Sequence, residues 1–282
     1  MKELPIPTFA ISQLDLRSAL WPTASRRGES QVAAKRPRQQ AGGLSVQWAR
    51  HQDDVRAAQR LRYDVFACEM GARLNTPLAG HDVDRFDDFC EHLLVRDEAT
   101  QGVIGTYRAL TPSQAQRAGG TYTDTEFDLS RLQHLRPRMV ELGRSCVHVD
   151  HRHGGVILAL WGALATFMHC NQLDTMIGCA SIPMQHNGVS GGHAAASIWR
   201  RLSASHLVPL AQQVQPRVAL PIDLLDGSLE VEPPALIRGY LRLGARLLGA
   251  PAWDPDFNSA DLPMLMRIGD LPARYRSHLL GA

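Results

Sequence analysis

The sequence has almost no net charge of either sign. It holds 30 basic and 28 acidic side chains in 282 residues, a formal charge of +2, and only Lys2 and Lys35 are lysine. Proteins that bind nucleic acid as histones do carry a large positive excess, so this balance excludes that class. The basic residues are concentrated at one end, because residues 1–44 carry seven basic side chains against three acidic ones.

Cysteine is scarce and never stands at the spacing of a metal site. The five cysteines lack any C-x-x-C pair and lie in apolar stretches. This pattern excludes a disulfide framework and a cysteine zinc site, and it predicts reduced core thiols in a cytoplasmic protein. The first 16 residues contain no continuous apolar run, so we expect no secretory signal.

One long segment lacks formal charge. The twenty residues from Gly154 to Leu173 approach the length that spans a bilayer, but their second half carries Thr166, His169, Asn171 and Gln172. The segment therefore predicts a buried amphipathic helix and not a membrane span.

The chain divides into a tail and one larger domain. Residues 22–44 mix Pro, Gly, Ser, Gln and Arg with few large apolar groups, so we expect residues 1–44 to form a flexible basic tail and residues 45–282 a folded domain. Within that domain, apolar residues at helical spacing predict a helix over 53–70. Strand-like runs follow at 92–97, 103–110, 139–149 and 174–182, and the apolar helix lies between the last two. A strand, helix and strand in this order predict a parallel strand pair.

The segment 233–249 predicts an amphipathic helix with a basic face. Arg238, Arg242 and Arg246 are four residues apart and so fall on one stripe of a helix. Such a stripe is either an ordinary solvated surface or a contact for an acidic carrier protein or anionic lipid.

The run from Glu141 to Gly155, ELGRSCVHVDHRHGG, is the most informative part of the sequence. Arg152, Gly154 and Gly155 stand between a strand and a helix, where backbone N–H groups and the helix N-terminus bind phosphate. Glu141 and Arg144 are three apart, so a regular strand would place them on opposite faces. They share one site if the strand bulges near Gly143; otherwise they form a salt pair on an edge strand.

These motifs resemble the acetyl-coenzyme A motif of the GNAT acyltransferase superfamily. The likeness narrows to the L-ornithine Nα-acyltransferases of ornithine lipid synthesis, which are related to the acyl-homoserine lactone synthases. It is carried by RYDVFACEMGA at 62–72, HDVDRFDDFCEHLLV at 81–95, GTYRAL at 105–110, ELGRSCVH at 141–148, GCASIP at 178–183, PPALIRGYLRLGARLLG at 233–249 and FNSADL at 257–262. The resemblance implies an α/β fold of GNAT type, a twisted mixed sheet flanked by helices.

The resemblance also implies a reaction. An acyl chain, 3-hydroxylated in that family, would pass from an acyl-carrier-protein thioester to the α-amine of ornithine and give lyso-ornithine lipid. The thioester is a co-substrate, and no permanently bound cofactor is expected. Because the product is an amphiphile, we expect the protein to act at the inner face of the cytoplasmic membrane.

Each site residue receives an expected role. Glu141 would remove the proton from the attacking amine, and Arg144 would hold that carboxylate or the carboxylate of the acceptor. Backbone N–H groups at Cys146 and Val147 would stabilise the oxyanion. The loop from Arg152 to Gly155 would bind the phosphate of the phosphopantetheine arm. By resemblance to the lactone synthases, the acceptor pocket would be closed by Arg62, Phe66 and Arg108.

The acidic loop at 82–88 allows three interpretations. Asp82, Asp84, Asp87 and Asp88 form a solvated loop, a subsite for the cationic end of ornithine, or a metal site. A calcium loop is disfavoured because Asp87 stands where glycine is required. His148, His151 and His153 straddle the strand end and the loop, so their directions diverge and we expect no metal there.

Two departures from the family pattern leave alternatives open. Ile157 stands where the superfamily often has Gly or Ala, and Met184 to Asn187 stand where the family suggests a Gly and an Asp. Three rival functions therefore remain. The chain acylates another amine acceptor, it is an acyl-homoserine lactone synthase, or it is a catalytically dead module that binds a carrier or a membrane.

Overall fold

The computed structural model describes residues 43–152, 154–273 and 275. Most of the proposed tail, residues 1–42, and His153 of the histidine motif lie outside the described residues. The strands are β1 (Leu44–Trp48), β2 (Glu91–Asp97), β3 (Val103–Leu110), β4 (Phe127–Asp128), β5 (Met139–Val147), β6 (Thr175–Pro183), β7 (Gln185–His186), β8 (Val189–Ser190), β9 (Gln215–Pro216), β10 (Arg246–Leu247), β11 (Ala252–Asp254) and β12 (Ser259–Arg267). The α-helices are α1 (Gln52–Tyr63), α2 (Pro112–Arg117), α3 (Tyr122–Glu126), α4 (Gly155–Cys170), α5 (His193–His206) and α6 (Ala235–Arg242). Helix α1 continues as a π-helical turn, Asp64–Glu69, and a 3₁₀ segment spans Ser130–Arg138.

Within the described residues, eight strands form one mixed sheet in the order β1-β2-β3-β5-β6-β12-β10, with β11 also paired to β12. The pairs are antiparallel except for β5 and β6, which run parallel. Helix α4 connects these two strands, so the predicted strand–helix–strand unit with its parallel pair is confirmed.

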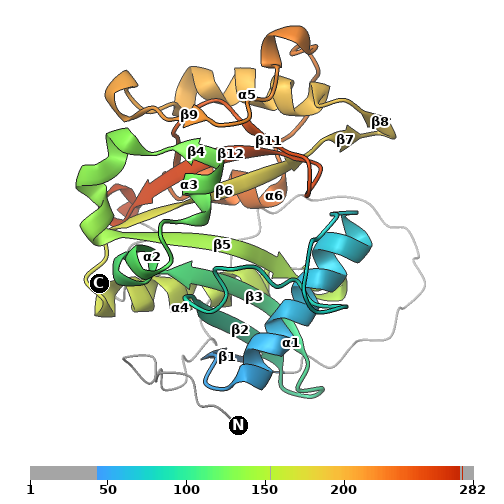
Figure 1. Cartoon of the computed structure of the whole chain (residues 1–282), viewed down its shortest axis with the longest axis vertical. Helices are drawn as coiled ribbons and strands as arrows, with labels where there is room; N and C mark the ends of the chain where they lie inside the picture. The colour runs from blue at the N-terminus through green and yellow to red at the C-terminus, as the bar shows by residue number, and fades with distance from the viewer. Residues whose placement is uncertain (1–42, 153, 274, 276–282) are drawn as a thin grey trace, which may run out of the picture.

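Helices cover both faces of the sheet (Figure 1). Alternate residues of each strand point to opposite faces, so Leu93 and Val95 pack against α4 while Leu94 packs against α1. The uncharged helix α4 contributes Val156, Leu160 and further residues to the largest core cluster. No described helix is long and apolar enough to cross a membrane, and the prediction of a buried helix for this segment is confirmed.

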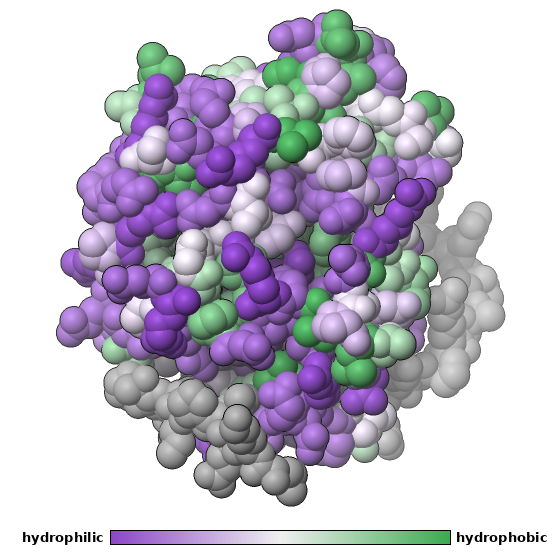
Figure 2. Space-filling model, in the orientation of Figure 1, coloured by the Kyte–Doolittle hydropathy of each residue, from purple (hydrophilic) through white to green (hydrophobic). Residues whose placement is uncertain are grey.

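A second core lies between β6, β12 and helices α5 and α6. The face shown in Figure 2 is mostly hydrophilic, with hydrophobic side chains in small scattered groups. The described cysteines are all free, as the spacing predicted, but Cys68 is exposed at the end of the π-helical turn, so the core prediction is wrong for that thiol.

The strands β5 and β6 pair only near their beginning and then diverge (Figure 1). Their register runs from Met139–Thr175 to Glu141–Ile177 and goes no further. Beyond that point β5 bulges, because two residues, Arg144 and Ser145, face one residue of β3 between the pairs Arg108–Gly143 and Thr106–Cys146. Arg144 adopts a left-handed backbone with φ of 50°. The bulge predicted near Gly143 is confirmed, centred one residue later.

The predicted helix over 233–249 is wrong in its second half. Helix α6 ends at Arg242, and Arg246 lies in strand β10, where it pairs with Leu265 of β12. Gly244 breaks the helix with φ of +93°, and a Cβ there would stand 2.8 Å from the carbonyl oxygen of Asp270. Arg238, Arg242 and Arg246 therefore do not form one helical stripe.

Candidate active site

The divergence of β5 and β6 leaves a cavity of about 680 Å³. It opens through the sheet, so residues of both faces line it. Strand alternation separates these residues into two arms. The arm beside α4 and α6 is mostly apolar and includes Ile157, Trp161, Met176, Leu236, Tyr240, Met264 and Met266. The arm beside α3, the polar arm, carries the ionisable lining residues next to apolar ones such as Ile177 and Leu265. Its polar residues are Arg108, Tyr122, Glu141, Arg144, Cys179, Ser181, Asp254 and Asp261.

Arg144 lines the polar arm. Its guanidinium carbon lies 4.8 Å from the ring centre of Tyr122 and 4.6 Å from that of Phe257. The same group forms ion pairs with Asp82 at 3.2 Å and Asp84 at 3.1 Å. The bulge therefore brings both Glu141 and Arg144 to the cavity, as predicted, but Arg144 holds the acidic loop and not the Glu141 carboxylate.

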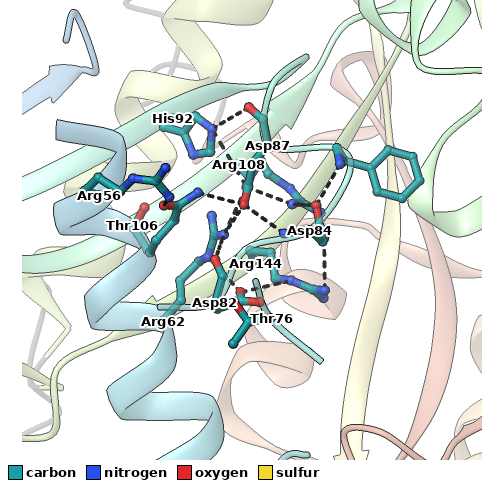
Figure 3. Close-up of polar contacts among 12 residues, drawn as sticks. Arg56, Arg62, Thr76, Asp82, Asp84, Asp87, His92, Thr106, Arg108 and Arg144 are labelled. Atoms are coloured by element: carbon teal, nitrogen blue, oxygen red, sulfur yellow. Dashed lines mark hydrogen bonds and ion pairs between the residues drawn. The ribbon is translucent and has the colours of Figure 1, made fainter. Parts of the chain in front are cut away.

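The acidic loop is tied into a buried ion-pair network, the Arg62 cluster, which we define as Arg62, Arg108, Arg144, Asp82, Asp84 and Asp87 (Figure 3). Arg62 is fully buried and donates to Asp82 at 2.8 Å and to both Asp87 oxygens at 2.9 Å. Arg108 donates to Asp84 at 2.6 Å and to Asp87 at 3.0 Å. Three arginines thus face three aspartates.

The Arg62 cluster favours the ionised form of two of its carboxylates, Asp84 and Asp87. Burial alone would raise the pKa of Asp87, but the charges of Arg62 and Arg108 outweigh it and hold that pKa far below its usual range. For Asp84 burial is likewise outweighed by Arg108 and Arg144, so its pKa is also lowered. Neither Arg62 nor any of the three aspartates lines the cavity, whereas Phe66 and Arg108 do. The structure therefore does not support an ammonium subsite at Asp82, Asp84 and Asp87, because arginine charges already occupy these carboxylates.

Glu141 lies at the point where the two strands separate. Its Oε1 accepts bonds from the backbone N–H and the hydroxyl of Thr123, both at 2.6 Å, and its Oε2 accepts one from the N–H of Tyr122 at 2.8 Å. These donors form the start of α3, so the carboxylate caps that short helix. Burial raises the pKa of Glu141, although the Thr123 and Tyr122 bonds oppose the shift.

The strand after the bulge presents one backbone donor to the opening. The N–H of His148 bonds the carbonyl oxygen of Ile104, which makes that residue pair a hydrogen-bonded one. Because bonded and non-bonded pairs alternate in an antiparallel ladder, Cys146 bonds β3 while the N–H of Val147 points away from it. Of the two predicted oxyanion donors, the geometry favours Val147. Burial raises the pKa of the Cys146 thiol to about 12, so this cysteine is not poised as a nucleophile.

The predicted phosphate loop lies at the start of α4. Gly154 has a φ of +98° and precedes Gly155, the first residue of the helix. Arg152 donates to the carbonyl oxygen of Val147 at 2.9 Å and forms an ion pair with Glu69 at 2.7 Å. Arg152 and Gly154 line the cavity, which places the loop at the end of the cleft.

Sequence reasoning missed several residues of the polar arm. Tyr122 and Asp254 join across the cavity wall through a bond of 3.1 Å from the tyrosine hydroxyl. Asp261 lies on β12 opposite Ser181 of β6. Phe257 and Asp261 belong to the run FNSADL, which carries part of the family resemblance. The sequence of that run does not indicate which of its side chains face a site.

Comparisons with known proteins agree with this geometry. Residues 61–162 match the family model described as Acetyltransferase (GNAT) domain. A protein of Brucella abortus named L-ornithine N(alpha)-acyltransferase is 34% identical over 252 residues, 84% of this chain and 89% of its own. A protein of Agrobacterium fabrum with the same name is 36% identical over 262 residues, 85% of this chain and 86% of its own. The solved structure of BjaI, a CoA-dependent acyl-homoserine lactone synthase, matches this chain with a TM-score of 0.51 and 16% sequence identity. The match covers 85% of this chain and 89% of the BjaI chain, and it shows that the two share a fold. With its GNAT fold, its cavity between diverging strands and relatives of this identity over most of its length, the chain is an N-acyltransferase and belongs to the L-ornithine N(alpha)-acyltransferase family.

Proposed function

We propose that the protein transfers an acyl chain from an acyl-carrier-protein thioester to the α-amine of ornithine and forms lyso-ornithine lipid. The observation that carries the proposal is the cavity with one polar and one apolar arm. A small cationic amino acid fits the polar arm and a long acyl chain the apolar arm. The names of the relatives supply the acceptor.

In the proposed reaction the free α-amine attacks the thioester carbonyl carbon. A C–N bond forms, the C–S bond breaks, and the thiolate leaves and takes up a proton. Glu141 accepts the proton of the amine, directly or through a water, a role worth about 10²–10⁴ in rate. Two features support this assignment: Oε2 accepts a single bond from the described residues, and burial raises the pKa of the carboxyl. The N–H of Val147 stabilises the oxyanion that develops on the carbonyl oxygen.

The donor would lie along the opening between β5 and β6. Arg152, Gly154 and Gly155 would bind the phosphate of the pantetheine arm, since Gly154 and Gly155 stand at the N-terminus of the 16-residue helix α4. The carrier protein is acidic in this proposal, and the exposed Arg242 and Arg246 are its candidate contacts. Arg238 is less available because it is only partly exposed and its guanidinium donates to the carbonyl oxygen of Pro233 at 2.6 Å.

We further propose that the protein works at the inner face of the cytoplasmic membrane, where its amphiphilic product would enter the lipid. The basic side chains of residues 1–44, with Arg238, Arg242 and Arg246, would each contribute a weak attraction of about 1 kcal/mol to an anionic membrane surface. Binding to vesicles with and without anionic lipid measures this association, and equal binding to both would contradict it.

A substrate panel tests the proposed function. The purified chain is incubated with one acyl chain as its carrier-protein and its coenzyme A thioester, each with the common amino acids and ornithine. Thiol release is followed and the amide is identified by mass spectrometry. We expect ornithine-dependent thiol release and N-acyl ornithine, faster with the carrier thioester. A different amide would indicate another amino acid acceptor, and no acceptor-dependent thiol with any donor would indicate a binding module without activity.

A further inference from the structure

The polar arm contains two buried carboxylates that form no ion pair with the residues that the structure describes. Asp254 and Asp261 line the cavity, and their residues are 5% and 3% exposed. Among the residues that the structure describes, no Arg, Lys or His lies within ion-pair distance of either, in contrast to the aspartates of the Arg62 cluster. A buried charge without a partner is costly, so this pair is suited to a cation that arrives from outside.

The two carboxylates also lack the surroundings of a metal site. Asp254 accepts bonds from the backbone N–H groups of Asp256 and Phe257 and from the hydroxyl of Tyr122, and Asp261 accepts one from the hydroxyl of Ser259 at 2.8 Å. Within the described residues no group of three or more His, Cys, Asp or Glu side chains is arranged to hold a metal ion. An ammonium group, which needs two or three acceptor oxygens and no fixed coordination, fits this arrangement better.

The position along the sheet matches an acceptor that extends from Glu141. Glu141 pairs with Ile177, and Asp261 pairs with Ser181, four residues further along β6. Ser181, like Ile177, points to the α3 face by strand alternation, so Asp261 and Glu141 stand on the same face, with Asp261 nearer the open end. An amino acid with its α-amine at Glu141 would point a long side chain toward Asp261.

We infer that Asp254 and Asp261 form the subsite for the side-chain ammonium of the acceptor and so select a diamino acid over neutral amino acids. The inference rests on the proposed function and names the residues that recognise the far end of its acceptor. It replaces the acidic loop, whose carboxylates are matched by arginines, as the origin of selectivity.

The electrostatics of the two carboxylates agree with this role. Burial raises the pKa of Asp261 to about 6, and the charge of Asp254 adds to the shift while Ser181, Ser259 and Arg144 oppose it. Burial, with the charges of Asp261 and Asp254, also raises the pKa of the neighbouring Glu126 to about 7. A bound ammonium would relieve this repulsion, so its binding is favoured where a neutral side chain gains nothing.

Two acceptors that share a carbon chain test the inference. Ornithine is compared with 2-aminopentanoate, which lacks only the terminal amine, using one thioester donor, and kcat/KM is measured for each. We expect the wild-type chain to prefer ornithine by roughly 100-fold, the effect of a charge-assisted contact of a buried pair. Asp261→Asn should remove most of that preference, mainly through KM for ornithine, and leave kcat/KM for 2-aminopentanoate within about threefold. Asp223→Asn, an exposed aspartate outside the cavity lining, is the matched control and should change neither value.

The results distinguish failure of the proposed function from failure of the ammonium subsite. If the wild-type chain acylates no amino acid, the proposed function is wrong. If it acylates ornithine and Asp261→Asn keeps the full preference, the ammonium subsite is wrong while the function stands. A loss that is equal for both acceptors would also overturn the subsite, because it would mean a general role in folding or chemistry. Should Asp261→Asn not fold, Asp254→Asn decides, because Asp254 is the other carboxylate of the subsite and lines the cavity: a preference reduced roughly three- to tenfold supports the subsite, and an unchanged one overturns it.

Discussion

Neutralising Asp87 separates a structural role of the acidic loop from a role in binding the acceptor. Asp87 is 6% exposed and accepts bonds from Arg62, Arg108 and Gln59. The change Asp87→Asn leaves three arginines, of which Arg62 and Arg108 are buried, against two aspartates. It also points an amide N–H₂ group at guanidinium donors. The fully buried Arg62 then loses one of its two ion-pair partners.

The cost follows from the burial of that pair. Removing one partner of a buried ion pair destabilises a protein by about 3–5 kcal/mol, because the remaining charge stays buried without compensation. For a chain of this size each kcal/mol lowers the melting temperature by about 2–4 °C, so we expect a fall of roughly 6–20 °C.

Thermal and denaturant unfolding measure this prediction, and Asp88→Asn is its control. Asp88 is the exposed neighbour of Asp87 and forms no ion pair with any residue that the structure describes, so its change should stay within about 0.5 kcal/mol. A destabilisation by Asp87→Asn of under about 1 kcal/mol, together with a raised KM for ornithine, would refute the structural assignment and restore the loop as an acceptor site.

Two further predictions concern Glu141 and His92. Glu141→Gln should lower turnover at neutral pH by at least about tenfold if this carboxylate is the base, and unchanged turnover removes Glu141 from the chemistry. The same change should weaken the cap of α3 by about 1–3 kcal/mol. Turnover is therefore compared at a temperature where unfolding curves show both proteins folded. Burial lowers the pKa of His92 to about 4, opposed by Asp87. The folded chain thus stays neutral at His92 while the unfolded chain takes up a proton below about pH 6.5, and stability should fall by about 3 kcal/mol from pH 7 to pH 4. In His92→Gln, unfolding measured across that range should show a loss smaller by this amount, and an equal loss in both proteins would contradict the assignment.

Much of the fold follows from local patterns in the sequence. The run 103–110 is apolar enough to predict strand β3, and its observed bounds agree with the expected ones. The uncharged run after Gly155 predicts α4, whose buried face completes the core beneath the strands. In both cases the burial that fixes the element is encoded by neighbours along the chain.

The errors arise where distant residues decide the outcome. The loop 82–88 is acidic, but the arginines that neutralise it come from α1, β3 and the bulge of β5. Nothing near Asp82 in the sequence indicates that three arginines will converge on this loop. Likewise Arg246 continues a helical spacing, yet pairing with Leu265 places it in a strand. The resemblance to a family identified motifs but could not tell which of their side chains face the cavity.

The bulge of β5 connects the fold to the division of the cavity into two arms. An unbroken ladder would pair β3 and β5 at every residue, and Glu141 and Arg144 would then point to opposite faces. The additional residue at Arg144 reverses the alternation of side chains along β5, so Glu141 and Arg144 both line the cavity. Arg144 also reaches Asp82 and Asp84 of the acidic loop and forms ion pairs with them. Apolar side chains are left on the face of α4 and α6, and the carboxylates of Glu141, Asp254 and Asp261 on the face of α3. In the proposed reaction the two substrates would therefore approach from opposite faces of the sheet, and the separation of charge from hydrocarbon would orient each before the bond forms.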